Sequence, residues 1–211
     1  MSTPGGLVKV WDPFIRLFHW TVAVGFFIAY LTDDLLTLHV WAGYVIGGLL
    51  VLRIVWGVIG PRHARFVDFV YRPAKVTAYL RDLISFRAKR YLGHSPAGGA
   101  MAVVLMLGLA VTVWTGLELY AAEENGGPLA VAPTEEQQMR LPVVLVSRDE
   151  DEAQEGENDN NGEGIWEELH EVLANLTLVL VLVHIAGVLL TSVVHRENLA
   201  KAMVTGYKRA N

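Results

Sequence analysis

Two histidines, His170 and His184, lie in a part of the chain that is otherwise almost entirely apolar. No charged residue follows Glu171 until after Val194, and this length suffices for one helix to cross the ~30 Å hydrocarbon core of a bilayer. A histidine inside such a helix is costly and should have a partner. Neutral imidazole is a common metal ligand, although a lone membrane histidine more often bonds to a neighbouring helix. The spacing between His170 and His184 helps to distinguish metal binding from a hydrogen bond to a neighbouring helix.

The fourteen residues from His170 to His184 correspond to ~21 Å along a helix axis. Fourteen steps of ~100° end within about 40° of a whole number of turns, so both rings project from the same face. One face of one membrane helix therefore carries a potential ligand near each side of the bilayer.

Two further histidines, His19 and His39, lie in other apolar stretches. His19 is five residues inside the stretch that starts near Phe14, and His39 is at the start of the next one. Matching depths in the membrane pairs His39 with His170 on one side and His19 with His184 on the other. Each pair is then divided between two helices, which is how ligands are placed in the core of a helix bundle.

The chain has no cysteine, which excludes disulfides, thiolate-bound zinc, iron–sulfur clusters and covalently attached c-type heme. Two pairs of histidines at two depths favour two noncovalently bound hemes. An iron with two axial histidines has no open position, so such hemes are expected to pass single electrons and not to bind oxygen or activate a substrate.

Arg53 and Gly43 lie on the same apolar stretch as His39. Arg53 follows His39 by fourteen residues, so it shares that face, and a heme propionate is a suitable bidentate partner for its guanidinium. The alternative is that Arg53 extends to the membrane surface. Gly43 could make room for a macrocycle or permit close helix packing. His94, in the segment YLGHSPAGG, is a candidate contact for a propionate or a quinone, or else a surface histidine.

These side chains require membrane-spanning helices to position them. Hydrophobic residues make up 53% of the 211-residue chain and charged residues only 18%, below the usual quarter. We predict an all-α membrane protein, a single domain over residues 1–211 that forms a bundle of four transmembrane helices. The predicted spans are Phe14–Leu31, Leu38–Ile59, Ala97–Leu119 and Leu169–Val194. We expect the first to be a permanent span and not a cleaved signal, because no small-residue cleavage site follows it.

The connecting segments predict the orientation. Residues 60–96 carry eight basic and two acidic side chains, a net charge of +6, whereas residues 121–164 carry twelve acidic and two basic ones, a net charge of −10. The positive-inside rule places residues 60–96 and both termini in the cytoplasm and residues 121–164, the acidic segment, outside. Residues 74–86 have the pattern of a short amphipathic helix on the lipid surface, and Ser147–Gly164 has a composition typical of disorder.

Four segments resemble a known family. WDPFIRLFHW at Trp11–Trp20, HVWAGYVIGGLLVLR at His39–Arg53 and GHSP at Gly93–Pro96 resemble the b-type cytochrome subunits of nickel–iron hydrogenases. HEVLANL at His170–Leu176, followed by His184, is similar to bacterial cytochrome b561 of the same di-heme superfamily. The resemblance implies that His19, His39, His170 and His184 are axial ligands of two hemes b and that Arg53 lies near the inner heme.

The resemblance also implies a multi-pass protein of the bacterial inner membrane that moves electrons between a periplasmic redox partner and the quinone pool of a respiratory chain. The partner would be a c-type cytochrome or a hydrogenase, and no nucleic acid is expected. The acidic segment departs from the family pattern and is either a steering surface for a basic partner or a solvated tether. A superoxide:quinone oxidoreductase and a heme-free membrane anchor or transporter are the alternative functions.

Overall fold

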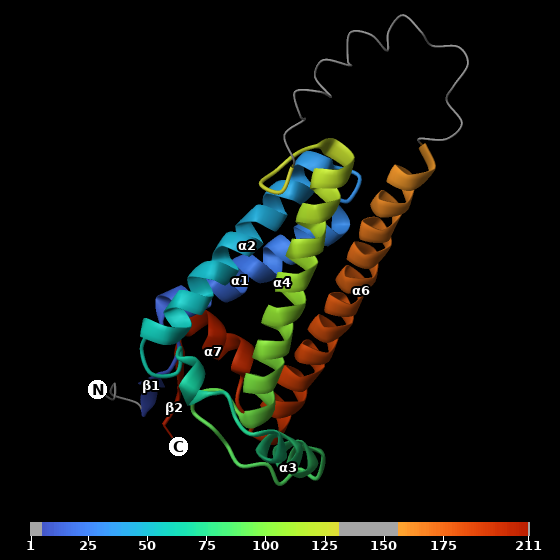
Figure 1. Ribbon diagram of the computed structural model, residues 1–211. Helices are drawn as coiled ribbons and strands as arrows, with labels where there is room; N and C mark the ends of the chain where they lie inside the picture. The colour runs from blue at the N-terminus through green and yellow to red at the C-terminus, as the bar shows by residue number, and fades with distance from the viewer. Residues whose placement is uncertain (1–5, 131–155, 211) are drawn as a thin grey trace, which may run out of the picture. The chain divides into compact units, whose positions relative to one another are not determined.

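A computed structural model describes residues 6–130 and 156–210, with side chains in the second range from residue 164 onward (Figure 1). Long helices dominate this part of the chain, and its strands are two of three residues each. The elements in chain order are β1 (Leu7–Lys9), α1 (Pro13–Leu31), α2 (Leu36–Ile59), the 3₁₀ turn η1 (Phe66–Asp68), α3 (Pro73–Ile84), α4 (Pro96–Glu124), α6 (Gly156–Val194), α7 (Leu199–Thr205) and β2 (Tyr207–Arg209).

The predicted four spans are confirmed. Helices α1, α2 and α4 and residues Gly164–Val194 of α6 are each long and apolar enough to cross a membrane. Two helices are several residues longer than predicted, because polar residues at one end continue the apolar helix. Helix α4 continues to Glu124, and α6 begins at Gly156. Adding residues to an existing helix is much easier than starting one, which accounts for the polar first turns of α6.

The early start of α6 corrects one prediction. Residues 156–164 are helical, so the predicted disorder over Ser147–Gly164 is wrong for that part, and residues 147–155 lie outside the described residues. The predicted amphipathic helix over 74–86 is confirmed as α3, Pro73–Ile84.

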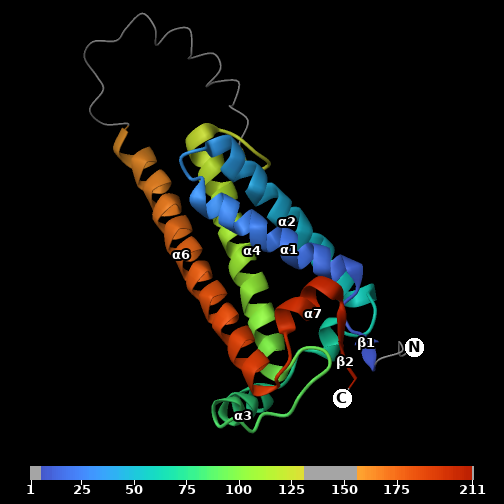
Figure 2. The same ribbon diagram turned by 180° about the vertical axis from the view of Figure 1, so that it is seen from behind.

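Backbone contacts divide the chain into two compact units. The first unit comprises Met1–Ala110 and Leu176–Asn211, and the second comprises Val111–Asn175. In the first unit α1 and α2 form an antiparallel hairpin, and they lie side by side in both views (Figures 1 and 2). Asp12 starts α1 by accepting hydrogen bonds from the backbone N–H groups of Phe14 and Ile15.

The two ends of the chain meet in the first unit. Strands β1 and β2 pair antiparallel, with Val8 opposite Lys208, and the backbone N–H of Val10 donates to Gly206 O at 2.9 Å. Arg16 of α1 donates to Val204 O of α7. Both views show β1, β2 and α7 at the N-terminal end of α1 (Figures 1 and 2). We call this end of the first unit, where β1, β2 and α7 lie, the terminal end.

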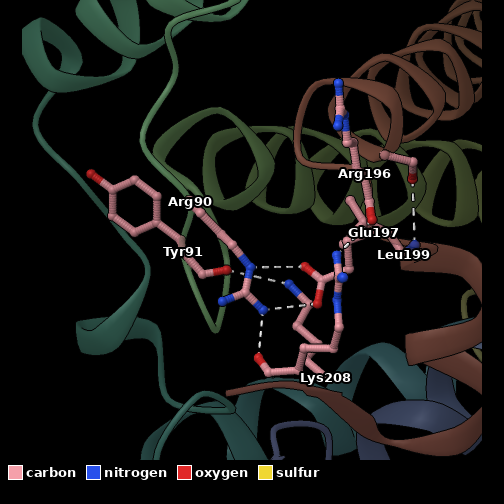
Figure 3. Close-up of polar contacts among 8 residues, drawn as sticks. Arg90, Tyr91, Arg196, Glu197, Leu199 and Lys208 are labelled. Atoms are coloured by element: carbon pink, nitrogen blue, oxygen red, sulfur yellow. Dashed lines mark hydrogen bonds and ion pairs between the residues drawn. The ribbon is translucent and has the colours of Figure 1, made fainter. Parts of the chain in front are cut away.

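A polar junction fastens the C-terminal segment to the loop before α4 (Figure 3). Arg90 donates to both carboxylate oxygens of Glu197, at 2.9 and 3.3 Å, and Lys208 Nζ donates to Tyr91 O at 3.4 Å. The Glu197 side chain is only 6% exposed, against 25% for Arg90. Burial by itself raises the pKa of Glu197, but the hydrogen bond from Arg90 and the charge of Lys208 outweigh it, so that the pKa lies below its ordinary value.

Candidate functional site

His19 of α1 and His184 of α6 lie next to each other in the first unit. Their ring centroids are 6.3 Å apart, with an angle of 55° between the ring planes. The structure therefore brings together the two histidines that matched depths pair on the cytoplasmic side. Whether these two histidines could bind a metal depends on whether the distance between their rings fits two metal–imidazole bonds.

The spacing of the two rings suits one metal ion between them. A metal–imidazole bond of about 2.0–2.1 Å, with the ring centroid roughly 1 Å beyond the nitrogen, puts the centroids of two opposed ligands roughly 6 Å apart. No group of three or more potential protein ligands occurs among the described residues. A bare ion would need such a group, whereas a heme would supply four nitrogens of its own and could be held by the two histidines alone. The pair fits a heme.

Arg53 of α2 is buried at the terminal end, only 4% exposed, so it does not extend to the surface. Its Nη2 donates to Ala64 O at 2.9 Å, and its guanidinium lies 4.9 Å from the centroid of the Phe66 ring. Gly57, one turn after Arg53, permits this packing, because a Cβ there would lie 2.1 Å from the Phe66 ring. Arg53 Nη1 is buried without a hydrogen-bond partner among the described residues.

His94 is held between aromatic rings and is not a surface histidine. Its ring centroid is 4.5 Å from that of Phe69 and 4.7 Å from that of Trp11. Its Nδ1 is buried and has no hydrogen-bond partner among the described residues. Burial, reinforced by the nearby charge of Arg53, lowers the pKa of His94 to about 3, so the ring is neutral at physiological pH.

Buried polar atoms without partners collect at the terminal end of the first unit. The five such side-chain atoms found among the described residues are Arg16 Nε, His19 Nδ1, Arg53 Nη1, Trp56 Nε1 and His94 Nδ1. They come from the start of α1, the end of α2 and the loop before α4. Buried donors normally have an acceptor, so this cluster suits a bound group with several acceptor oxygens.

His39, at the start of α2, contacts α1. Its Nδ1 lies 2.9 Å from Ala29 O, and a carbonyl can only accept, so Nδ1 carries the proton and Nε2 the lone pair. Gly43, one turn later, has open space beside it, since a Cβ there would meet no heavy atom within 4 Å. Close helix packing against the described residues therefore does not explain why position 43 is a glycine.

His170 belongs to the second unit, where it contacts α4. Its Nδ1 lies 3.1 Å from Thr115 Oγ1. A Cβ on Gly116 would lie 2.9 Å from His170 Cε1, so the glycine allows the ring to approach the helix. His39 and His170 are in different units, and their pairing stays a prediction.

Comparison with known proteins identifies the family. The family model of prokaryotic cytochrome b561 matches residues 10–206, nearly the whole chain. The chain belongs to the prokaryotic cytochrome b561 family. This cytochrome is therefore a multi-pass membrane protein with heme b as its prosthetic group and electron transport as its chemistry.

Curated relatives agree with the family. A probable Ni/Fe-hydrogenase B-type cytochrome subunit of Cupriavidus necator is 24% identical over 94% of this chain and 86% of its own length. Subunits of the same description from Azotobacter vinelandii and Azotobacter chroococcum are each 30% identical over 54% of this chain and 60% of theirs. No solved structure matches the cytochrome.

Several residues of the candidate site in this cytochrome b561 relative carried no sequence signal. Phe66 and Phe69, which pack near Arg53 and His94, have the sequence pattern of ordinary apolar residues outside the spans. Trp11 belongs to the WDPFIRLFHW motif, but the motif does not indicate that Trp11 packs against His94. Thr115 lies in the segment VWTGLE, which has no recognisable motif. The sign of it in the sequence is a hydroxyl residue within an apolar span.

Proposed function

We propose that this cytochrome transfers electrons across the bacterial inner membrane through two hemes b, each held by two histidines. His19 and His184 hold the inner heme, and His39 and His170 hold the outer one. Electrons pass between a redox partner outside the membrane and the quinone pool. When bound, each heme supplies a one-electron couple, and the chain's own residues fix its orientation and exclude other ligands.

The single observation that carries this proposal is the 6.3 Å spacing of the His19 and His184 rings, from helices far apart in the sequence. A hydrogen-bonded histidine pair would have its nitrogens within ~3.2 Å of each other. In the described part of the chain, His19 Nδ1 is buried and has no hydrogen-bond partner, so it does not bond to His184. Two histidines that would hold one heme between them account for this spacing.

The cluster of unpartnered donors at the terminal end supports the inner heme. Arg53 Nη1 and Trp56 Nε1 are buried donors that need acceptors, and heme propionates are carboxylates suited to a guanidinium. His94, kept neutral by its surroundings, has one nitrogen able to donate to a propionate or a quinone carbonyl. Because residues 60–96 are basic, we assign this end to the cytoplasm, where quinone reduction would also take up protons.

The outside partner is a hydrogenase or a c-type cytochrome. The names of the curated relatives favour a hydrogenase. The net charge of −10 in the acidic segment suits a partner with a basic surface. The same charge disfavours a superoxide:quinone oxidoreductase, since a negative surface repels an anionic substrate.

Purified cytochrome in proteoliposomes tests the proposed function. A reduced-minus-oxidised spectrum is expected to show b-type heme, and a quinone added to the reduced protein is expected to reoxidise it. Superoxide is expected to reduce it no faster than an uncharged reductant of similar potential does. Absence of heme would reject the proposal, and rapid reduction by superoxide would favour the enzymatic alternative.

A further inference from the structure

We infer that Thr115 is a positioning residue for His170: its hydroxyl accepts a hydrogen bond from His170 Nδ1–H and so presents Nε2 as the ligand atom. This inference rests on the proposed function, in which His170 is an axial ligand. It concerns contacts wholly inside the second unit, between α4 and α6.

The direction of the hydrogen bond follows from the proton of the Thr115 hydroxyl. That hydroxyl has one proton, which it donates to Thr112 O at 3.0 Å, one turn earlier in α4. Its remaining hydrogen-bonding capacity is as an acceptor. The contact of 3.1 Å with His170 Nδ1 must then be a donation from the ring. Nδ1 carries the proton, and Nε2 carries the lone pair that binds a metal.

Burial of Thr115 favours this arrangement. Thr115 is only 2% exposed, so water cannot replace the hydroxyl. The neighbouring Gly116 brings the ring onto the helix surface, because any Cβ there would lie 2.9 Å from Cε1 and 3.3 Å from Nδ1. Thr115 thus sets the protonated nitrogen, and Gly116 sets how closely the ring approaches.

The same tautomer occurs at His39, where Ala29 O fixes the proton on Nδ1. A backbone carbonyl cannot be removed by substitution, whereas the hydroxyl at Thr115 can. Losing an outer partner of a metal-bound histidine typically weakens metal binding 10–100-fold. Substituting Thr115 therefore tests, with one side-chain change, whether a hydrogen bond orients a ligand histidine.

The experiment compares three variants of the full-length cytochrome. Thr115→Val keeps the shape and removes the hydroxyl, Thr115→Ser keeps the hydroxyl, and Thr112→Val makes the same chemical change one turn away while retaining the backbone carbonyl. The first readout is the Nδ1–H signal of His170 by nitrogen-15 NMR of the reduced protein. The second is retention of each heme during titration with apomyoglobin as a heme acceptor.

Thr115→Val is expected to lose or shift the Nδ1–H signal and to release one of two hemes 10–100-fold more readily. Thr115→Ser and Thr112→Val are expected to resemble the wild type. Wild-type signals and heme retention in Thr115→Val would overturn the inference and leave the proposed function standing. If the wild type held no heme, the proposed function would fail, and the His170 signal alone would decide whether Thr115 accepts its proton.

Discussion

Arg53 is buried and His94 is partly buried, with its Nδ1 inaccessible, at one end of the first unit, where a charge is costly. They meet this cost differently. Arg53 stays charged and satisfies part of its guanidinium with Ala64 O and the faces of aromatic rings. His94 gives up its proton, because its pKa falls to about 3. One buried cation beside one neutral imidazole leaves a site that suits a single anionic group.

His94 should make the protein sensitive to acid. Its pKa is about 3 in the folded protein and about 6.5 when unfolded, so between these values the unfolded chain binds a proton that the folded one does not. Stability contributed by neutral His94 is therefore complete above about pH 6.5 and falls as pH drops, by up to ~1.4 kcal/mol per pH unit. His94→Gln is expected to flatten the loss of thermal stability between pH 7 and pH 5.

Thermal denaturation of the wild type and His94→Gln in the same detergent checks this prediction. The other titratable groups are common to both proteins, so the difference between the two pH profiles isolates His94. Parallel profiles would show that burial of the neutral ring contributes nothing to acid sensitivity.

The pairing of His19 with His184 could be predicted from the sequence. The position of each histidine within its predicted helix gives its depth in the membrane, and the two depths match. The burial of Arg53 was not predictable in the same way. Its position near a helix end is equally compatible with extension to the surface. Arg53 is buried because the segment after α2 folds back, so that Phe66 and Phe69 cover the guanidinium. Such contacts depend on loop geometry, which apolar periodicity does not specify.

Among the elements, the four long helices were predictable and the short ones were only partly so. Uninterrupted apolar length specifies a membrane span, and α3 has the spacing of an amphipathic helix. Strands β1 and β2 have only three residues each and are held by pairing between the two ends of the chain. No local pattern of that length can specify a partner some 200 residues away.

The polar junction should contribute measurably to stability. Removing one member of a fully buried ion pair costs about 3–5 kcal/mol. Because Arg90 is partly exposed, we expect Glu197→Gln to lower the free energy of unfolding by about 2 kcal/mol. It should also expose β2 and α7 to proteolysis, since the Arg90–Glu197 contact holds this segment against the loop before α4.

The matched control is Asp68→Asn in the ion pair Arg65–Asp68, which has the same 3.3 Å contact but side chains that are 45% and 26% exposed. This change is expected to cost less than ~1 kcal/mol. Equal effects of the two substitutions on denaturation and proteolysis would mean that burial of Glu197 does not strengthen the junction.

For the whole molecule, we expect the uneven distribution of charge to give the cytochrome a basic cytoplasmic face and an acidic outer face. Residues 60–96 have a net charge of +6 and residues 121–164 a net charge of −10. Because successive spans cross a membrane in alternating directions, we expect these two segments on opposite sides. We expect the basic face to bind the anionic inner leaflet. We expect the acidic face to meet the redox partner, as long-range attraction increases association rates.

Neutralising part of the acidic segment tests this role. Changing Asp149, Glu150, Asp151 and Glu152 to their amides keeps the length and removes four charges. If the segment steers a basic partner, electron transfer from that partner should slow at low ionic strength and depend less on salt. Stopped-flow kinetics over a range of salt concentrations measures both effects. A segment that is only a solvated tether would leave the rates unchanged.

We propose that four histidines hold two hemes at separate sites. The most direct measurement is the heme content per chain, from pyridine hemochrome spectra of the wild type, His39→Ala and His184→Ala. We expect two hemes in the wild type and one in each variant, because each substitution removes a ligand histidine from a different site. A wild type with a single heme, or variants that keep both, would contradict it.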